Sequence, residues 1–564
     1  MRITKVHIEN YRSLKDFTFE PGPYCVLIGE NNAGKSNILL ALNLVLGEMW
    51  PSERSFSEDD FYNQDTSKDI LIQVYFDATI EEWRNNHKVE VAGIQLRCKT
   101  YKRKTKDKPA GTLKTDFLCI DVNGKELTHP EEPLQKGQQF KGRWVPLRVS
   151  SDIREHIPFI YVEVLRDYNR QTPGSRWSVL RRLFNEVNTE FLNDKTMVKV
   201  NQTDGTTIQM TRKEAFTQSV RDAYQYLRTP SFEEIERKLA HNAMDHMGLD
   251  EGESKIGLHF ESHDPTNAYK SLQLYVQQLG IESQAGEVGA GLQSAIVVAI
   301  FRTYEEMKKE GAIFSIEEPE VFLHPQKARY FESVLRRLAE SGNQVFLTTH
   351  SPVFVGIHKP ESVAIIRRNR DRGTWACQAT VDQLTKSDRQ VLRLLTEFDT
   401  ERKELFFAKG VMLVEGCTEK IALPLAFRAL GEDINKRGIS IVEVGGKTKL
   451  PLFVRVLNSL NIPYIVLADH DVREIDDRWS EARKDEEQQH NSKHARWNAD
   501  IEKVCNAGTL FWMKPNFEAE FGLPHNESEK IDKALELFKD SSPEIIKDCL
   551  RNPITALIEK VKGI

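Results

Sequence analysis

Four carboxylates in the last third of the chain have the types and spacing for metal chemistry. Glu415 and Glu419 follow one short apolar run, and Asp469 and Asp471 end another, 465–468. Each run is typical of a buried parallel strand, and the carboxyl ends of neighbouring strands in an open α/β sheet converge on one crevice. Four hard oxygen donors in one crevice repel each other unless cations lie among them. Mg²⁺ or Mn²⁺ is the expected occupant.

The spacing within each pair agrees with a shared cleft. Glu419 lies four residues after Glu415, in the first turn of an expected helix, and Asp469 and Asp471 alternate along a strand. Two metal ions roughly 4 Å apart would bind a scissile phosphate, generate hydroxide from water and stabilise the departing 3′-oxygen. Either pair alone is equally compatible with a charged loop. Four acids in order on two apolar strands favour the metal site.

A nucleotide site is predicted near the N-terminus. The sequence GENNAGKS at 29–36 fits GxxxxGK[ST], and it follows the apolar run 25–28 and opens an apolar helix at 37–46. Loop amides would cradle the phosphates, Lys35 would reach the β- and γ-phosphates, and Ser36 would bind Mg²⁺. The residues expected to bind nucleotide here are Gly29, Asn31, Asn32, Gly34, Lys35, Ser36 and Asn37.

Two later apolar runs end in residues that suit ATP hydrolysis. The run 313–316 leads into Glu317 and Glu318. Glu317 would hold the Mg²⁺ shell through water, and Glu318 would orient or activate the attacking water. His350 ends the run 345–349 and could sense the γ-phosphate; taken alone, a structural histidine is the alternative.

A glycine-containing turn, 288–293, precedes the apolar helix expected at 294–304. Gly291 and Gln293 would present amides to a phosphate at the start of that helix. A simple turn before a core helix is the alternative.

Length and composition limit the protein class. A chain of 564 residues with 40% hydrophobic and 29% charged residues is expected to form two to four globular domains. Its apolar runs are too short for a membrane helix, and its seven scattered cysteines form no CxxC pair, which predicts a reducing cytoplasm and no zinc or disulfide framework. With a net charge of −6, any DNA contact must come from local basic patches or bound metal.

The pattern of apolar and charged segments predicts four regions. A first ATPase part spans 1–165, a helical insert 166–255, a second ATPase part 256–395 and a further α/β domain 405–564. Two charged segments are ambiguous. The stretch 97–106 is either a solvated hairpin edge or a phosphate contact, and 472–500 is either a mobile helix over the cleft or a solvated helix.

Taken together, the ATPase motifs resemble the ABC-type, SMC-like ATPases, with Walker A at 29–36, a signature-like segment at 289–293, Walker B at 313–318 and a switch histidine at 350. The acids at 415–419 and 469–471 resemble the Toprim domain of topoisomerases, primases and related nucleases. The combination resembles the OLD (overcoming lysogenization defect) family, which includes the Gabija nuclease subunit and retron-associated effectors. The resemblance implies an α/β fold, in which an ABC-type ATPase head with an inserted helical dimerisation segment is followed by a Toprim α/β domain with a parallel sheet.

The resemblance also implies a function: an ATP-binding and ATP-hydrolysing, metal-dependent DNA endonuclease of anti-phage defence, in which nucleotide state gates the Toprim site. Expected cofactors are ATP and Mg²⁺ or Mn²⁺ at both sites. Expected partners are DNA, a second copy of the chain through heads and insert, and an accessory protein or reverse-transcribed RNA–DNA element, with no membrane. A RecF-like or SMC-like repair ATPase, or a nucleotide-sensing scaffold, with a vestigial Toprim domain is the alternative.

Further ligands follow from the family pattern. Glu518 resembles the additional OLD acid, with Glu520 as the near alternative. Arg551 is the preferred late basic residue beside the transition state, among the candidates Lys514, Arg551, Lys560 and Lys562. Lys447, after the turn 444–446, either contacts a DNA phosphate or is a surface lysine.

Three departures from the ATPase pattern matter. Ala290 replaces the usual signature serine, Glu317 replaces the commoner Walker B aspartate, and no long heptad array for coiled-coil arms is present. The lost serine hydroxyl favours a slow ATP-gated switch over a motor.

Overall fold

The computed structural model describes residues 1–562 apart from 101–111, 134–141, 164–177, 202–206, 226–228, 231–232, 235–236, 238–274, 279–280, 308–310, 322, 357–358, 380–383, 397–398, 525 and 540–545. The chain forms two compact units. Unit 1 comprises Met1–Val164 and Lys309–Ile564, and unit 2 comprises Leu165–Lys308. Among the described residues, no helix is both long and apolar enough to cross a membrane.

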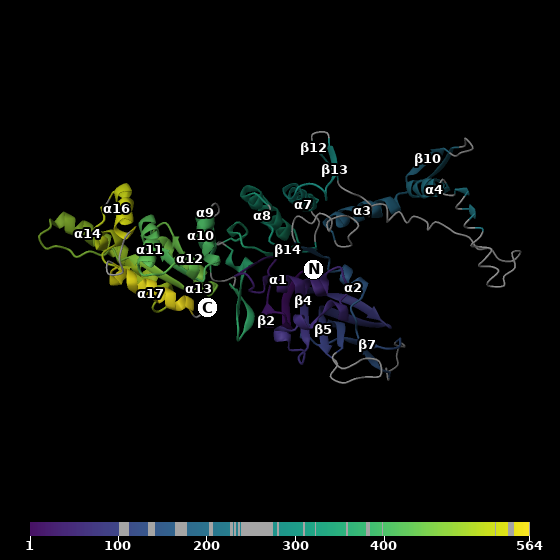
Figure 1. The fold of residues 1–564 in the computed structure, drawn as a ribbon, viewed down its shortest axis with the longest axis horizontal. Helices are drawn as coiled ribbons and strands as arrows, with labels where there is room; N and C mark the ends of the chain where they lie inside the picture. Colours follow the sequence, from purple (N-terminus) through teal and green to yellow (C-terminus); the bar gives the residue numbers. More distant parts are fainter. Residues whose placement is uncertain are drawn as a thin grey trace. The chain divides into compact units, whose positions relative to one another are not determined.

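A six-stranded sheet forms the centre of the N-terminal part of unit 1, with strand order β17-β16-β3-β15-β14-β9. Figure 1 labels its strand β14. Neighbouring strands are parallel except β16 and β17. The strands β3 and β15 are apolar along almost their whole length because both faces of a parallel sheet are covered. The bounds of these strands are β3 Tyr24–Ile28, β9 Phe159–Val162, β14 Ile313–Glu317, β15 Gln344–Thr348, β16 Val363–Asn369 and β17 Gly373–Gln378.

Three helices accompany this sheet: α1 (Lys35–Leu46), α2 (Ser151–Glu155) and α8 (Pro325–Glu340). Helix α1 starts directly after the glycine-rich loop and buries Ile38, Leu39 and Leu42. The predicted strand–loop–helix around Gly29–Ser36 is therefore confirmed, because β3 ends at Ile28 and α1 begins at Lys35.

An antiparallel sheet lies in the same unit, with strand order β2-β1-β4-β5-β6. Its apolar residues, including Ile8, Ile72 and Ile94, join Leu39 and Leu42 of α1 in one hydrophobic core. This core fixes the base of the glycine-rich loop. The bounds are β1 Ile3–Tyr11, β2 Leu14–Phe19, β4 Ile70–Arg84, β5 His87–Thr100 and β6 Leu113–Ile120, with a small ribbon formed by β7 Thr128–Pro130 and β8 Trp144–Pro146.

Unit 2 contains both helices and hairpins in its described part. The helices are α3 (Val179–Asn193), α4 (Arg212–Gln225) and α7 (Ala290–Glu306). Two hairpins, β10–β11 and β12–β13, accompany them, with bounds β10 Met197–Asn201, β11 Thr207–Thr211, β12 Tyr275–Gln278 and β13 Ile281–Gln284. The prediction of a helical insert at 166–255 did not include the β10–β11 hairpin. The compact unit also includes α7, which the sequence pattern placed in the second ATPase part.

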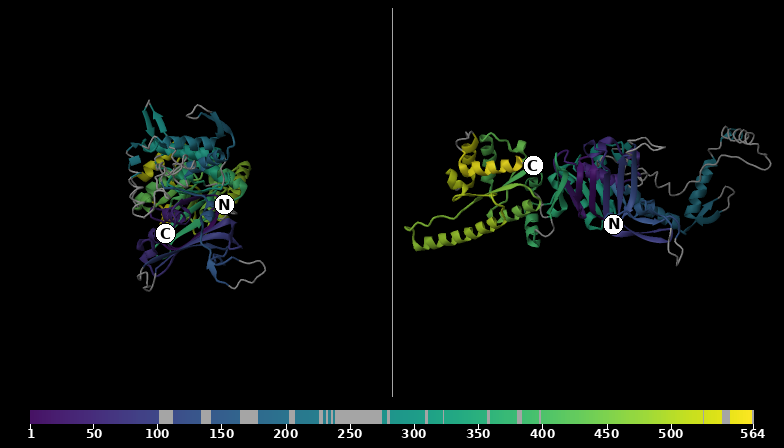
Figure 2. Two further views of the ribbon diagram at one scale, coloured as in Figure 1. Left: turned by 90° about the vertical axis from the view of Figure 1, so that its right-hand side faces the viewer. Right: turned by 90° about the horizontal axis from the view of Figure 1, so that it is seen from below.

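The C-terminal part of unit 1 is a second α/β sheet with strand order β19-β18-β20-β21, parallel throughout. The right-hand view of Figure 2 shows α14 as the long yellow-green helix of this region. The strands are β18 Gly410–Val414, β19 Ile439–Glu443, β20 Tyr464–Asp469 and β21 Leu510–Met513. The helices are α9 Lys386–Thr396, α10 Thr400–Lys403, α11 Cys417–Ala429, α12 Ile434–Arg437, α13 Leu450–Ser459, α14 Glu481–Val504, α15 Phe517–Phe521, α16 Glu527–Lys539 and α17 Asp548–Lys562.

Candidate nucleotide and metal sites

The glycine-rich loop is shaped for a phosphate by tight packing beneath it. Gly34 has φ +109°, and a Cβ there would lie 2.6 Å from both Ser13 Oγ and Thr374 Oγ1. Lys35 is 6% exposed, and its Nζ donates to the carbonyl oxygens of Gly29 at 2.9 Å and Glu30 at 3.0 Å. Burial lowers the pKa of Lys35, an effect opposed by nearby Glu318 and Glu320. The loop therefore carries a protein-derived cation at its centre.

The asparagines of the predicted site have different environments. Asn37 Nδ2 donates to Ser13 Oγ at 2.8 Å, which secures the start of α1. Asn32 has a left-handed backbone (φ 66°), and its carbonyl oxygen accepts from Arg368 Nη1 at 3.3 Å. Asn31 is exposed. The side chains of Asn31 and Asn32 are therefore both open to solvent, whereas Asn37 is half-buried and held by Ser13.

The acids after β14 lie close to the loop. The Tyr161 hydroxyl donates to Glu317 Oε1 at 2.9 Å. Burial raises the pKa of Glu317, while hydrogen bonds from Tyr161 and Ser36 lower it. Ser36 and Glu317, both predicted Mg²⁺ ligands, are thus brought together.

Glu318 occupies a strained turn directly after β14. Its φ is 42°, and its backbone N–H donates to Thr348 O at 2.9 Å. His350 Nε2 lies 3.8 Å from Glu318 Oε1, so the structure places the two predicted catalytic residues side by side. Glu320 Oε1 accepts from the His350 backbone N–H at 2.7 Å, a role that the sequence did not predict. The sequence feature that could have indicated this role is the acidic run Glu-Glu-Pro-Glu at 317–320, which ends in Glu320.

The signature-like residues belong to unit 2. Gly291 and Gln293 lie in the first turn of α7. Gln293 Nε2 donates to the carbonyl oxygens of Gly286 at 2.8 Å and Val288 at 2.9 Å, which ties the preceding turn to the helix. These two hydrogen bonds agree with the predicted turn before the helix. Phosphate binding by Gly291 and Gln293 stays a prediction.

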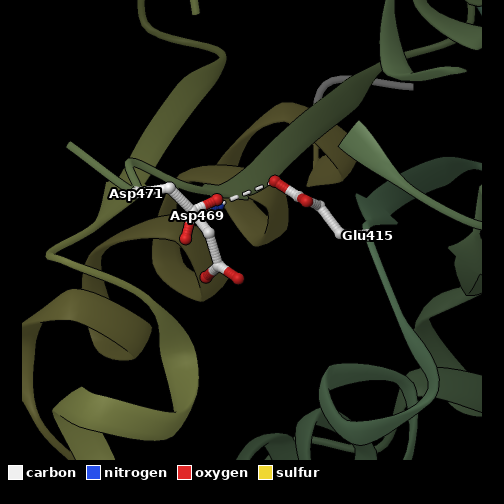
Figure 3. Close-up of side chains that lie close together, drawn as sticks. All are labelled: Glu415, Asp469 and Asp471. Atoms are coloured by element: carbon white, nitrogen blue, oxygen red, sulfur yellow. Dashed lines mark hydrogen bonds between the residues drawn. The ribbon is translucent and has the colours of Figure 1, made fainter. Parts of the chain in front are cut away.

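Three of the four C-terminal acids form one cluster, drawn in Figure 3. Glu415 follows β18, Asp469 ends β20, and Asp471 lies in the loop beyond it. One ligand oxygen from each lies within 4.8 Å of the others. Glu415 Oε1 accepts from the Asp469 backbone N–H at 2.9 Å, and Asp469 Oδ1 accepts from the Phe517 N–H at 2.8 Å. The neighbouring parallel strands β18 and β20 produce this convergence.

Burial of these acids is energetically unfavourable without a cation. It raises the pKa of Glu415 to about 7 and that of Glu419 to about 7. Burial and, to a smaller extent, the charges of Glu419, Glu415 and Asp471 together raise the pKa of Asp469 to about 9. These carboxylates repel each other and are partly removed from water, so together they form a ligand set that fits a divalent metal ion.

Glu419 and Glu518 lie beside this cluster. Glu419 is 6% exposed in the first turn of α11, and Glu518 raises its pKa after the larger effect of burial. Glu518, on α15, accepts from Lys530 Nζ at 3.1 Å. The alternative acid Glu520 instead pairs with Lys547 at 3.0 Å. The ion pair with Lys530 was not predicted.

Lys447 points toward the acids. It is 5% exposed, and its Nζ donates to the Asp469 carbonyl oxygen, to the His470 carbonyl oxygen at 3.2 Å and to Asp471 Oδ2 at 3.2 Å. Nζ also lies 5.6 Å from the ring centroid of Trp512. The surface-lysine interpretation is therefore wrong, because Lys447 is buried and donates to one carboxylate of the acid cluster, Asp471. Among the late basic candidates, Lys514 and Arg551 are exposed, and Lys562 pairs with Glu559.

The two ambiguous charged segments are partly resolved. Arg97 pairs with Glu126 at 3.2 Å and Lys99 with Asp116 at 2.9 Å, as in a hairpin surface, whereas 101–106 lies outside the described residues. The segment 472–500 contains most of α14, which is not solvated on every side. Asn498 is 5% exposed and its Nδ2 donates to His470 O at 2.9 Å, so one face packs on the loop after β20.

Comparison with known proteins agrees with this architecture. Residues 1–355 match the AAA ATPase domain family, and residues 406–471 match the TOPRIM domain of overcoming lysogenization defect protein-like proteins. The OLD nuclease of Thermus scotoductus is 30% identical over 562 residues, covering 98% of both chains. The chain belongs to the OLD nuclease family.

Two more distant relatives are also named as nucleases. The Old nuclease of Escherichia phage P2 is 24% identical, covering 84% of this chain and 77% of its own. Endonuclease GajA of Bacillus cereus is 23% identical, covering 84% of this chain and 75% of its own. The predicted OLD membership and the α/β fold with an ATPase head and a parallel-sheet Toprim domain are confirmed.

Proposed function

We propose that this OLD protein cleaves DNA phosphodiester bonds at the Toprim acid cluster with Mg²⁺ or Mn²⁺, and that nucleotide bound at the head controls cleavage. The acid cluster carries the proposal. Glu415, Asp469 and Asp471 converge at one sheet edge in a half-buried, mutually repelling arrangement. The nuclease names of its relatives support the same reaction.

Divalent ions in such a site supply a water-derived nucleophile and neutralise charge on the phosphate and the leaving oxygen. This chain would hold them through the three clustered acids, with Glu419 and Glu518 as further ligands. Lys447 would fix the loop that carries Asp471, through its contacts with Asp469 O and His470 O. Arg551, from the family pattern, would assist at the transition state.

At the head, Lys35 and the loop amides would bind ATP phosphates, and Ser36 and Glu317 would hold Mg²⁺. Glu318 would orient the attacking water and His350 would contact the γ-phosphate. A second copy of the chain would offer Gly291 and Gln293 to complete the nucleotide site, and the helical insert would join the copies. Anti-phage defence, with or without an accessory protein or RNA–DNA element, is the biological setting that the family resemblance suggests.

Nicking of supercoiled plasmid tests the nuclease assignment. Asp469→Asn should reduce nicking in Mg²⁺ or Mn²⁺ by more than about 10²-fold, because it removes a ligand charge directly. ATP binding should stay unchanged. The exposed Asp477→Asn provides a matched control and should nick like the wild type. Equal nicking by both variants would reject the nuclease function and favour a repair ATPase with a vestigial Toprim domain.

Gating by nucleotide is supported by a cavity of about 690 Å³ beside the glycine-rich loop. Its lining includes Gly29–Ala33 and also 406–409, the residues immediately before β18. Lys409 Nζ lies 2.7 Å from Glu30 Oε1. A nucleotide in this cavity would therefore contact the chain just before the strand that presents Glu415.

Comparison of two ion-pair variants tests this coupling. Lys409→Ala should bring the ratio of nicking with and without ATP close to one, whereas ATP affinity should change less than about tenfold. Lys359→Ala is the matched control, because the Lys359–Glu340 pair has nearly the same side-chain exposures, 41% and 61%, as Lys409–Glu30, 40% and 64%. An unchanged ATP response in Lys409→Ala would reject this route of control.

A further inference from the structure

The turns after β14 and β15 carry the two residues proposed to act at the γ-phosphate. The side chains of Glu318 and His350 are 48% and 39% exposed, so packing alone does not fix them. The parallel pairing of the two strands ends at Glu317 and Thr348. His350 lies two residues beyond that pairing, and its distance from Glu318 therefore depends on contacts between the two turns.

Glu320 joins these turns beyond the end of the paired strands. Its Oε1 accepts a hydrogen bond of 2.7 Å from the His350 backbone N–H. Its own backbone is held as well, because its carbonyl oxygen accepts from the Leu323 N–H at 3.0 Å. A hydrogen bond to a carboxylate is roughly twice as strong as one between neutral groups. Glu320 thus extends the connection between β14 and β15 to the residue that carries the imidazole.

The backbone of Glu318 is strained and depends on its surroundings. Its φ of 42° is uncommon for a residue with a Cβ, and such strain persists only where neighbouring contacts enforce it. The Glu318 N–H donates to Thr348 O at 2.9 Å, and the Glu318 carbonyl oxygen accepts from the Val321 N–H at 3.0 Å. The bond between Glu320 and His350 closes the same turn from its other side.

The second carboxylate oxygen of Glu320 argues against a purely structural role. Oε2 is buried and has no hydrogen-bond partner among the described residues. A neutral Gln side chain would make the same bond to His350 without burying a charged oxygen that lacks a partner. Burial lowers the pKa of Lys35, and the negative charges of Glu318 and Glu320 oppose that effect. The Glu320 carboxylate is therefore close to the residues expected to act on the nucleotide.

We propose that Glu320 is a positioning residue for ATP hydrolysis, which holds His350 opposite Glu318. The inference rests on the proposed function, in which Glu318 orients the attacking water and His350 contacts the γ-phosphate. His350 Nε2 lies 3.8 Å from Glu318 Oε1. Without the Glu320 carboxylate, the turn that carries the imidazole would lose its connection to the turn that carries Glu318, whereas Lys35 and the loop amides would still bind the phosphates.

Amide hydrogen exchange of the full-length protein tests the contact without any activity measurement. Exchange at His350, resolved with peptides that end on either side of it, should be at least about tenfold faster in Glu320→Ala than in the wild type. Glu320→Gln keeps an acceptor and should exchange more slowly than Glu320→Ala. Glu340→Ala removes an exposed acid of α8 and is the control, which should exchange like the wild type.

Steady-state ATP hydrolysis by the same variants distinguishes positioning from phosphate binding. In Glu320→Ala, kcat should fall at least about tenfold and KM should change less than about threefold, because Lys35 and the loop amides are unchanged. Glu320→Gln should recover most of the lost kcat, and Glu340→Ala should behave like the wild type. Thermal unfolding checks that all variants are folded.

An unchanged kcat in Glu320→Ala would overturn the proposal even if exchange at His350 became faster. A defect confined to KM, or equal exchange in Glu320→Ala and the control, would overturn it too. Failure of the proposed head function has a different signature, since the wild type itself would then bind ATP without hydrolysing it, and Glu320 would have no reaction to support.

Discussion

The nucleotide site and the acid cluster are both built at the carboxyl ends of parallel strands, yet they balance charge differently. At the head, Lys35 lies inside the glycine-rich loop and bonds to two of its carbonyl oxygens. In the Toprim domain, Glu415, Asp469 and Asp471 face each other, and Lys447 contacts only one of their carboxylates. The head contains its own cation, whereas the acid cluster, under the proposed function, would depend on ions from solution.

Because of this difference, the two sites differ in what they can bind without a further ion. A site with a built-in cation can hold an anionic nucleotide directly after folding. Partly buried acids with raised pKa values would have to exchange protons for metal before such a site could act. Under the proposed function, nucleotide and metal would supply two inputs to one chain.

The largest expected effect concerns the head. Glu318→Gln should lower ATP turnover by about 10²–10⁴-fold, because it removes the group that orients the attacking water. ATP binding should be retained, since Lys35 and the loop amides are untouched. Single-turnover hydrolysis beside a filter-binding measurement checks both, and unchanged turnover would remove Glu318 from the reaction.

Removal of the Lys35 ammonium tests whether the nucleotide site and the acid cluster bind their ligands separately. Lys35→Ala should raise the Kd for ATP by about 10–100-fold, because a charge-assisted contact is worth about 1.5–3 kcal/mol. Mn²⁺ binding to the Toprim domain should not change. A loss of Mn²⁺ binding in this variant would show that the two sites are not separate.

The corresponding change at the nuclease site is Lys447→Met. Loss of the contacts with Asp471 and the Asp469 carbonyl should reduce nicking about 10–100-fold, as is usual for groups that orient metal ligands. Lys449→Met, in the same turn but bonded to Gly445 O, is the control. Higher Mn²⁺ should partly restore nicking to Lys447→Met, and full activity without added metal would contradict the positioning role.

The smallest effect concerns stability in the absence of metal. Asp469 and Glu415 have pKa values raised to about 9 and about 7, so the folded chain binds their protons more tightly than the unfolded chain. Their contribution is present at acid pH and is lost as pH rises from about 4 through 9. In EDTA, Asp469→Asn should raise Tm at pH 9 by roughly 2–4 °C and have little effect at pH 5.

Thermal unfolding at both pH values, with and without Mg²⁺, measures this. A bound divalent ion should reverse the order at pH 9, because it stabilises the wild-type carboxylate. Equal Tm shifts at pH 5 and pH 9 would contradict the assignment of buried, metal-seeking acids.

Sequence alone predicted the elements whose chemistry is local. The glycine-rich loop, the acids after β14 and the acids after β18 and β20 each follow a buried strand in continuous sequence. Contacts that depend on the folding of distant segments were not visible. Tyr161 reaches Glu317, Lys447 reaches Asp471, and Lys530 reaches Glu518 across separate elements. Spacing along the chain carries no signal for such pairs.

The interpretation of 472–500 shows the same limit. High charge suggested a solvated helix, but α14 buries Asn498 and Ile501 against its neighbours. Most residues of this 24-residue helix are exposed. Its overall composition is therefore that of a solvated helix, and the one narrow face that packs against its neighbours cannot be predicted from composition. Only the position of the loop after β20 distinguishes that face.

The aromatic ring above Lys447 gives the protein an internal optical reporter. Trp512 lies against both the Lys447 ammonium and, edge-on, the His470 ring, with centroids 5.6 Å apart. Indole emission is sensitive to a nearby charge, so filling of the acid cluster should change the fluorescence of this residue. Trp512→Phe would therefore assign a metal-dependent light signal to the acid cluster.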